Sequence, residues 1–459
     1  MTSTSVTSTA VNPTAVNPTA VNDTVAIQSI ALSQNRLVHR SQLPNGIVIL
    51  VTENPAADII STRLFLRGGQ RVESSAKAGL VHLVAAVLTK GTATKTSMQL
   101  AEQVESVGAS LGIDAAPDYF LISLKTVSDD FLAILTLAAE MLRSPSFPEA
   151  EFELERRLTL QALRTQQEQP FTVAMDYLRR AFYGHHPYAD GGLGTAETLI
   201  SLTREDLVTY HKTWFRPDNL IISLAGRVEA AQVITQIAGV LGDWQAPSTP
   251  LPTVQTPEVV LDPQQILIPQ DTQQSIVMVG YLAPAIAPNL KSIQDFAALK
   301  LLNTYLGNGL SSRLFVELRE KQGLAYEVST FYPTRLDPSH FVAYMGTAPE
   351  NTAIALEGLQ TELERLKDQP LSETELQTTQ RKLLGQYALG KQTNAQIAQI
   401  FGWYELLGAG VEFDLQFQET IAALSSSEIQ ATAQRHFDQS YYSILGPADF
   451  IQLDEDDEI

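Results

Sequence analysis

One imidazole in an apolar segment marks the place where this chain comes nearest to metal chemistry. The segment Ala78–Thr92 reads AGLVHLVAAVLTKGT, a composition that predicts a buried helix with His82 in its middle. A helical zinc site needs ligands four residues apart on one face, and in the inverted H-x-x-E-H arrangement a carboxylate base stands beside the second ligand. The chain has Ala86 at that ligand position and Ala85 at that base position. Because catalytic zinc takes three protein ligands, His82 is predicted to be a core imidazole.

Other catalytic chemistries find little support in the residue types. The chain has no cysteine, which excludes thiol nucleophiles, disulfides and cysteine-type zinc sites. Of seven histidines only His185 and His186 are neighbours, and adjacent side chains point in different directions, so this pair is expected to be structural. No Ser/His/Asp or paired-carboxylate pattern stands out, so a different kind of active site has no support.

The formal net charge of −20 argues against nucleic-acid binding, because phosphate recognition needs clustered lysine and arginine. The acidity favours solubility, with electrostatic steering of basic peptides as the alternative. No apolar run reaches the roughly 18 residues of a membrane-spanning helix. The N-terminus lacks the basic start and apolar core of a secretory signal. We therefore expect a soluble protein of the cytoplasm.

The elements that would position His82 follow from hydrophobic periodicity and turn signals. An Asn-Gly turn at Asn45 joins two strands between His39 and Val51. The pattern further predicts strands over 59–66, 120–127 and 220–226, and helices over 98–108, 130–142, 149–167 and 202–210.

Composition divides the chain into five parts. Residues 1–35 carry a Thr-Ala-Val-Asn repeat with too little apolar surface to offset the entropy of ordering, which predicts a disordered arm. Proline-rich residues 247–264 are expected to be an extended linker. The linker separates a domain over 36–246 from a domain over 265–450, and residues 451–459 form an acidic, solvated tail.

The second domain repeats the first. Segment 202–226 has a counterpart over 424–446, the His82 helix has one over 295–307, and the helix 149–167 has one over 373–387.

Short motifs around the His82 helix and in the second domain carry a resemblance. Arg67-Gly68-Gly69 and Glu73 precede the helix, Lys90-Gly91-Thr92 follow it, and residues 311–326 read SSRLFVELREKQGLAY. These stretches resemble the pitrilysin/insulinase metallopeptidases, which include the subunits of the mitochondrial processing peptidase. The resemblance covers about residues 36–450. It implies an α+β fold of two homologous halves, each a mostly antiparallel sheet flanked by helices, that form a bowl.

The resemblance also implies a degenerate metal site. Zinc-bearing members have a glutamate ligand on the long helix after the motif, and that position falls on Ala162, two turns after Glu155. With His82 as the one remaining ligand, no metal or other cofactor is expected in this chain.

The resemblance also implies roles for two further features of the sequence. Arg319 and Tyr326 have the seven-residue spacing of an arginine and a tyrosine that reach the zinc site, where both donors suit a carbonyl oxygen gaining charge. A local role in helix and strand is the alternative. The loop with Gly307 and Gly309 corresponds to a substrate-gripping loop, or equally to a helix C-cap and turn.

These features together imply a non-catalytic, substrate-binding subunit of a two-subunit zinc peptidase acting on unfolded peptides. Its partner would be a paralogous chain that bears zinc on an intact H-x-x-E-H motif. The alternative is a structural or assembly subunit with no role in proteolysis, like the core proteins of the respiratory cytochrome bc complex.

Overall fold

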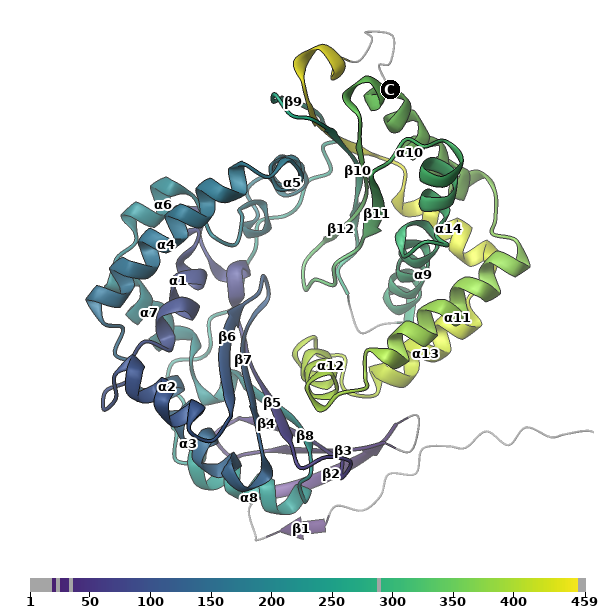
Figure 1. The fold of residues 1–459 in the computed structure, drawn as a ribbon. Helices are drawn as coiled ribbons and strands as arrows, with labels where there is room; N and C mark the ends of the chain where they lie inside the picture. The colour runs from purple at the N-terminus through teal and green to yellow at the C-terminus, as the bar shows by residue number, and fades with distance from the viewer. Residues whose placement is uncertain (1–18, 22–24, 33–35, 287–289, 453–459) are drawn as a thin grey trace, which may run out of the picture.

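Two β-sheets covered by helices form the frame of the molecule, as Figure 1 shows. The computed structural model describes residues 19–21, 25–32, 36–286 and 290–452. An eight-stranded sheet has the order β1-β2-β3-β4-β8-β5-β7-β6, and a five-stranded sheet has the order β11-β12-β10-β13-β9. The predicted α+β fold with two sheets flanked by helices is confirmed.

The strands of both sheets are mostly antiparallel, with β4–β8 and β9–β13 as parallel pairs. The first sheet comprises β1 Thr19–Val21, β2 Val25–Ala31, β3 Leu37–Gln42, β4 Val48–Glu53, β5 Ile60–Arg67, β6 Ser110–Ala115, β7 Tyr119–Thr126 and β8 Leu220–Gly226. The second comprises β9 Gln265–Pro269, β10 Ser275–Ala283, β11 Glu327–Phe331, β12 Ser339–Thr347 and β13 Tyr441–Gly446.

The helices cover both sheets. Those before residue 245 are α1 Leu80–Leu88, α2 Ser97–Glu105, α3 Phe131–Arg143, α4 Glu149–Gln167, α5 Pro170–Tyr183, α6 Ala196–Ser201, α7 Arg204–Trp214 and α8 Ala230–Leu241. Those after it are α9 Leu290–Gly307, α10 Thr352–Asp368, α11 Glu373–Leu389, α12 Asn394–Leu406, α13 Phe413–Ala423 and α14 Ser426–His436.

The two sheets repeat one topology. The order β4-β8-β5-β7-β6 in the first corresponds strand for strand to β9-β13-β10-β12-β11 in the second. The helices before the inner parallel strands also begin alike, because Thr203 and Ser425 each form a capping box at the start of α7 and α14. The predicted helix counterparts also have equivalent places in the chain order. Helices α1 and α9 each lie between the equivalent strands β5 and β6 or β10 and β11, and α4 and α11 are each the second helix after β7 or β12.

Each half contributes one helix that packs against the sheet of the other half. Helix α5 packs against β13 and β10 of the second sheet, and α12 packs against β8 and β5 of the first, as Figure 1 shows. The inner face of the first sheet contributes Phe65 and Ile221, which cluster with Leu406 of α12. The exchange places residues from both halves around one inner surface.

The predicted disordered arm over 1–35 is wrong for part of its length. Strand β2 pairs with β3 over five residues from Ile27 to Ala31, and β1 pairs with β2. Backbone hydrogen bonds to a ready sheet edge offset the ordering entropy that composition alone does not. Residues 1–18 lie outside the described residues, as do 453–459 of the predicted acidic tail.

The proline-rich segment between α8 and β9 contains no helix or strand over residues 247–264, all of which the structure describes. Leu251 and Val254 pack against the core of the first half, and Val259 packs against the cluster formed by α5 and the second sheet.

Candidate functional site

The helix with His82 begins at a buried carboxylate. The Glu73 carboxylate accepts hydrogen bonds from the backbone amides of Val81 at 2.5 Å and Gly79 at 3.4 Å, at the N-terminus of α1. These amides are donors that the first turn of a helix leaves unpaired. Burial of the Glu73 carboxyl raises its pKa to about 8, against the opposing effect of the two amides. Glu73 thus fixes where α1 starts.

Helix α1 packs against α4, which brings His82 near Glu155. Burial lowers the pKa of the half-buried His82 imidazole, while the Glu155 carboxylate acts in the opposite direction. Glu155 is held by Lys90, at 2.8 Å between Nζ and Oε1.

The remaining positions of the degenerate motif carry methyl groups. Ala85 is buried in the core of the first half, Ala86 is half-buried, and Ala162 is exposed on α4. Among the described residues no group of three or more histidine, cysteine, aspartate or glutamate side chains could hold a metal ion. The predicted helices, α1 and α4, do lie together here. They contribute one imidazole, that of His82, and one carboxylate, that of Glu155, which is paired with Lys90.

Arg319 and Tyr326 lie together at the start of β11. Arg319 belongs to the π-helix η7, Phe315–Lys321, and its Nη1 donates to the backbone oxygen of Tyr326 at 2.7 Å. Its guanidinium also covers the Phe315 ring, 4.9 Å from the centroid. Tyr326 is 68% exposed. The backbone of Tyr326 is fixed to Gly346 of β12, so its phenol projects from an anchored position.

Gly307 is the last residue of α9, whereas Gly309 lies in the loop that follows, and their surroundings differ. A side chain on Gly307 would overlap the backbone of Thr330 in β11, so this glycine permits close packing. Gly309 has a φ of +82°, is exposed, and a Cβ added there would meet only the Lys382 Nζ atom, at 3.8 Å. The loop is fastened to α11, because Lys382 donates to the backbone oxygen of Asn308. Gly307 therefore serves packing, and Gly309 lies on the accessible part of the loop.

The structure gathers the predicted residues into two places. His82 lies on α1 in the first half, whereas Arg319, Tyr326 and the glycine loop lie around β11 in the second, and Figure 1 shows α1 and β11 on separate sides of the bowl. Strands β6 and β11, the equivalent edges of the two sheets, are the strands nearest to these two places.

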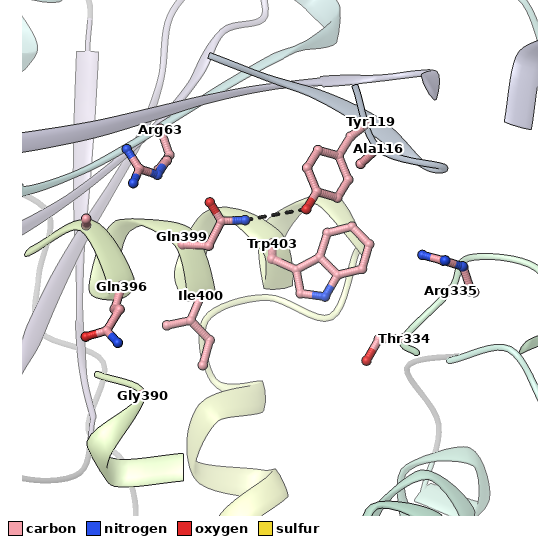
Figure 2. A pocket seen from close by; sticks show the side chains of 11 residues that line it. Arg63, Ala116, Tyr119, Thr334, Arg335, Gly390, Gln396, Gln399, Ile400 and Trp403 are labelled. Atoms are coloured by element: carbon pink, nitrogen blue, oxygen red, sulfur yellow. Dashed lines mark hydrogen bonds between the residues drawn. The ribbon is translucent and has the colours of Figure 1, made fainter. Parts of the chain in front are cut away.

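Sequence reasoning missed a cavity between the halves. It has a volume of about 510 Å³ and is shown in Figure 2. The first sheet contributes Arg63 and Tyr119, and the turn between β6 and β7 contributes Ala116. The loop between β11 and β12 contributes Thr334 and Arg335, and the remaining lining residues are Gly390, Ala395, Gln396, Gln399, Ile400 and Trp403. Arg63 and Arg67, four residues apart and therefore on one face of β5, were the available signal that this face meets polar space.

A polar contact near the cavity joins the halves. Arg71 of the first half is paired with Asp337 of the second, with Nη2 and Oδ1 2.8 Å apart. The buried His186 adds a contact from Nε2 to Asp337 at 3.1 Å, while its Nδ1 accepts from the Tyr188 amide. These hydrogen bonds and the positive charge of Arg71 hold the pKa of Asp337 well below its usual range, despite partial burial. The prediction that His186 is structural agrees with these contacts.

Two repeated α+β units with a degenerate H-x-x-E-H helix define a protein of the two-domain metallopeptidase class. A family model described as insulinase (peptidase family M16) matches residues 48–196, and one described as the peptidase M16 inactive domain matches residues 201–383. Together these matches span more than two thirds of the chain. The chain belongs to the insulinase/pitrilysin peptidase family M16, and the resemblance inferred from its motifs is confirmed.

Similar proteins agree with this assignment. An uncharacterized zinc protease of Mycobacterium leprae is 26% identical over 89% of this chain and 92% of its own length. One of Bacillus subtilis is 25% identical over 90% and 99%. The fold is also that of a protease from Helicobacter pylori (TM-score 0.83, 23% identity, 89% of this chain and 99% of that one). A peptidase M16 inactive domain from Pseudomonas fluorescens gives a TM-score of 0.79 at 24% identity, over 90% and 98%.

None of the helices within the described residues is long and apolar enough to cross a membrane.

Proposed function

We propose that this chain is the non-catalytic, substrate-binding subunit of a two-subunit zinc peptidase that acts on unfolded peptides. The zinc and its general base would belong to a paralogous partner with an intact H-x-x-E-H helix. Arg319 and Tyr326 would reach the partner's site and hold the substrate carbonyl. The observation that carries the proposal is the contrast between the two places. No group of side chains on α1 or elsewhere in the described residues could hold a metal ion, whereas the exposed Tyr326 is anchored through its backbone oxygen to Arg319.

The chemistry of the pair supports this role. Peptide hydrolysis puts growing negative charge on the former carbonyl oxygen, and a phenol and a guanidinium are donors suited to that charge. A donor aimed at this oxygen contributes more in the transition state than in the ground state, so its loss appears mainly in kcat. The neighbouring edge strand β11 offers unpaired backbone groups to an extended peptide.

The test is reconstitution with the H-x-x-E-H-bearing paralogue from the same genome. We expect this chain alone to retain no zinc after dialysis and to cleave no peptide, and the mixture to form a heterodimer whose hydrolysis a chelator blocks. Tyr326→Phe and Arg319→Lys should each lower turnover of the mixture about a hundredfold, with the heterodimer intact. About one retained zinc per chain, or association only with itself and no activity on mixing, would contradict the proposal.

Matched variants separate this role from general damage. Tyr177→Phe alters another exposed tyrosine, on α5. Arg381→Lys alters an arginine that, like Arg319, donates to a nearby backbone oxygen. Both should leave turnover unchanged.

A structural subunit is the second candidate, and the bond from Arg319 to the Tyr326 backbone favours it, because that bond gives Arg319 a local role. If Tyr326→Phe and Arg319→Lys both give wild-type turnover within an intact heterodimer, the chain is a structural subunit.

A further inference from the structure

We infer that the cavity between the two halves binds the carboxylate groups of an acidic peptide segment. The inference rests on the proposed function, since it specifies which peptides the subunit would hold. The cavity is lined by residues of the first sheet and of α12, as Figure 2 shows. Its lining includes neither His82 nor Arg319 nor Tyr326.

The charge of the lining is opposite to that of the chain. The whole sequence has 51 acidic and 31 basic residues, yet the cavity is lined by two arginines and no carboxylate. Figure 2 shows Arg63 and Arg335 on opposite sides of the group formed by Tyr119, Gln399 and Trp403. A ligand with two separated negative groups would meet one guanidinium at each end.

Neither guanidinium forms an ion pair with a carboxylate among the described residues, although the charge of Arg335 acts on the buried Asp118 carboxyl. Arg63 donates to the Thr62 backbone oxygen at 3.3 Å, and Arg335 lies over the Tyr188 ring, 5.6 Å from the centroid. The carboxylate that acts on Arg63 most is Asp114, an exposed residue of β6 that forms no ion pair with it. Both arginines are half-buried, and a buried charge is costly unless it is paired. A bound carboxylate would supply the missing partner.

The other lining groups are suited to the rest of a peptide. The Trp403 indole N–H can only donate and has no protein acceptor within the described residues. The Gln399 amide donates to the Tyr119 hydroxyl at 3.5 Å, which leaves its carbonyl oxygen available for a peptide N–H. The rings of Tyr119 and Trp403, 5.0 Å apart, give an apolar floor. The volume of about 510 Å³ is within the usual range of ligand sites, about 300–1,000 Å³.

The test is binding of labelled peptides to the isolated full chain, measured by fluorescence anisotropy. The probe is a short peptide of alternating Glu and Ala, and its matched control has Gln in place of Glu. We expect the Glu peptide to bind and the Gln peptide to bind at least tenfold more weakly. We expect affinity for the Glu peptide to fall as salt is raised, because screening weakens charge pairs.

Variants locate the site. Arg63→Gln and Arg335→Gln should each weaken the Glu peptide about tenfold, as expected for loss of one hydrogen bond to a charged group. Lys125→Gln is the matched control, since it removes one positive charge from β7 outside the cavity lining and should leave binding unchanged. Far-UV circular dichroism checks that each variant folds. If an arginine variant does not fold, Trp403→Phe keeps a ring and removes one donor, and should weaken binding severalfold.

Equal binding of the Glu and Gln peptides, or unaltered binding by the folded arginine variants, would overturn the inference. So would binding of free glutarate without binding of the Glu peptide, which would make the cavity a site for small dicarboxylates. The assay contains neither zinc nor partner. The result of this binding assay is therefore independent of whether hydrolysis can be reconstituted. Likewise, a lack of peptide binding would not contradict a successful reconstitution.

Discussion

Glu73 has a structural role at the start of α1, the helix that carries His82. Its carboxyl is buried at the N-terminus of α1, and burial raises its pKa to about 8. In the unfolded chain a glutamate titrates near pH 4.3. Between these values the native state holds a proton that the unfolded state has lost. Stability is therefore expected to fall as pH rises from about 4.3 to 8 and to change no further from this group above that range.

Glu73→Gln removes this titration and keeps an acceptor oxygen for the Val81 amide. At about 1.4 kcal/mol per pKa unit, we expect the difference in unfolding free energy between wild type and variant to shift in favour of the variant by a few kcal/mol from pH 5 to pH 8. Urea unfolding at both pH values measures this shift. If the difference in unfolding free energy between wild type and variant is the same at pH 5 and pH 8, the Glu73 carboxyl is ionised in the native state at both pH values.

At the residue scale, the sequence predicted residues whose positions a motif defines. It did not predict contacts between residues that are far apart in the chain or that depend on unusual local geometry. The methyl groups at Ala85 and Ala86 were readable because helical spacing ties them to His82. The bond from Arg319 to the Tyr326 backbone was not, because it depends on a π-helical turn that spacing does not encode. Arg63 and Arg335 are 272 positions apart in the chain, and no local pattern joins them.

At the scale of elements, the exchanged helix α12 depends on a glycine. A Cβ on Gly402 would overlap the Phe65 ring of β5, so this residue sets how closely α12 approaches the first sheet. Gly402→Ala gains helix propensity of up to about 1 kcal/mol but forces the helix away from the sheet, which typically costs about 1–3 kcal/mol. We expect a net loss of stability in chemical denaturation.

Gly385→Ala in α11 is the matched control. An added Cβ there meets nothing within 4 Å, and the residue is exposed, so helix propensity acts alone and should stabilise by about 0.5–1 kcal/mol. A Gly402 variant as stable as the Gly385 variant would mean that α12 tolerates displacement from β5.

Most elements were predictable because their own periodicity encodes them, and the predicted β8 over 220–226 matches the observed strand. The exceptions owe their structure to partners. Helix α5 was not predicted, although its apolar face packs on a sheet of the other half. Strand β6 was missed because, as an edge strand, it shows only weak alternation of burial.

At the scale of the whole molecule, the halves are fastened by exchanged helices and by a few polar contacts. Arg40 of β3 pairs with Glu405 of α12 at 2.8 Å, and Asp337 joins Arg71 to His186. The second of these contacts is better shielded, because the His186 side chain is fully buried and Asp337 is only 13% exposed. It lies next to the cavity, since the neighbouring Arg335 is part of the lining.

Asp337→Asn tests whether this contact holds the bowl together. The change leaves Arg71 half-buried without its counter-charge, and losing one partner of a buried pair typically costs about 3–5 kcal/mol. Because the site is partly open, we expect about 2–3 kcal/mol at pH 7. Asp243→Asn, which breaks an exposed pair with Arg143 on the outer surface, should change stability too little to measure.

Hydrogen exchange should show faster opening of the loop between β11 and β12 and of residues 69–72 in the Asp337 variant. The wild-type pair is expected to weaken only at strongly acidic pH, because the pKa of Asp337 is lowered and its stabilising effect is lost as pH falls through that value. If exchange in both segments equals that of wild type, the exchanged helices alone set the relation of the two halves, and the Arg71–Asp337–His186 contact only orders the cavity rim.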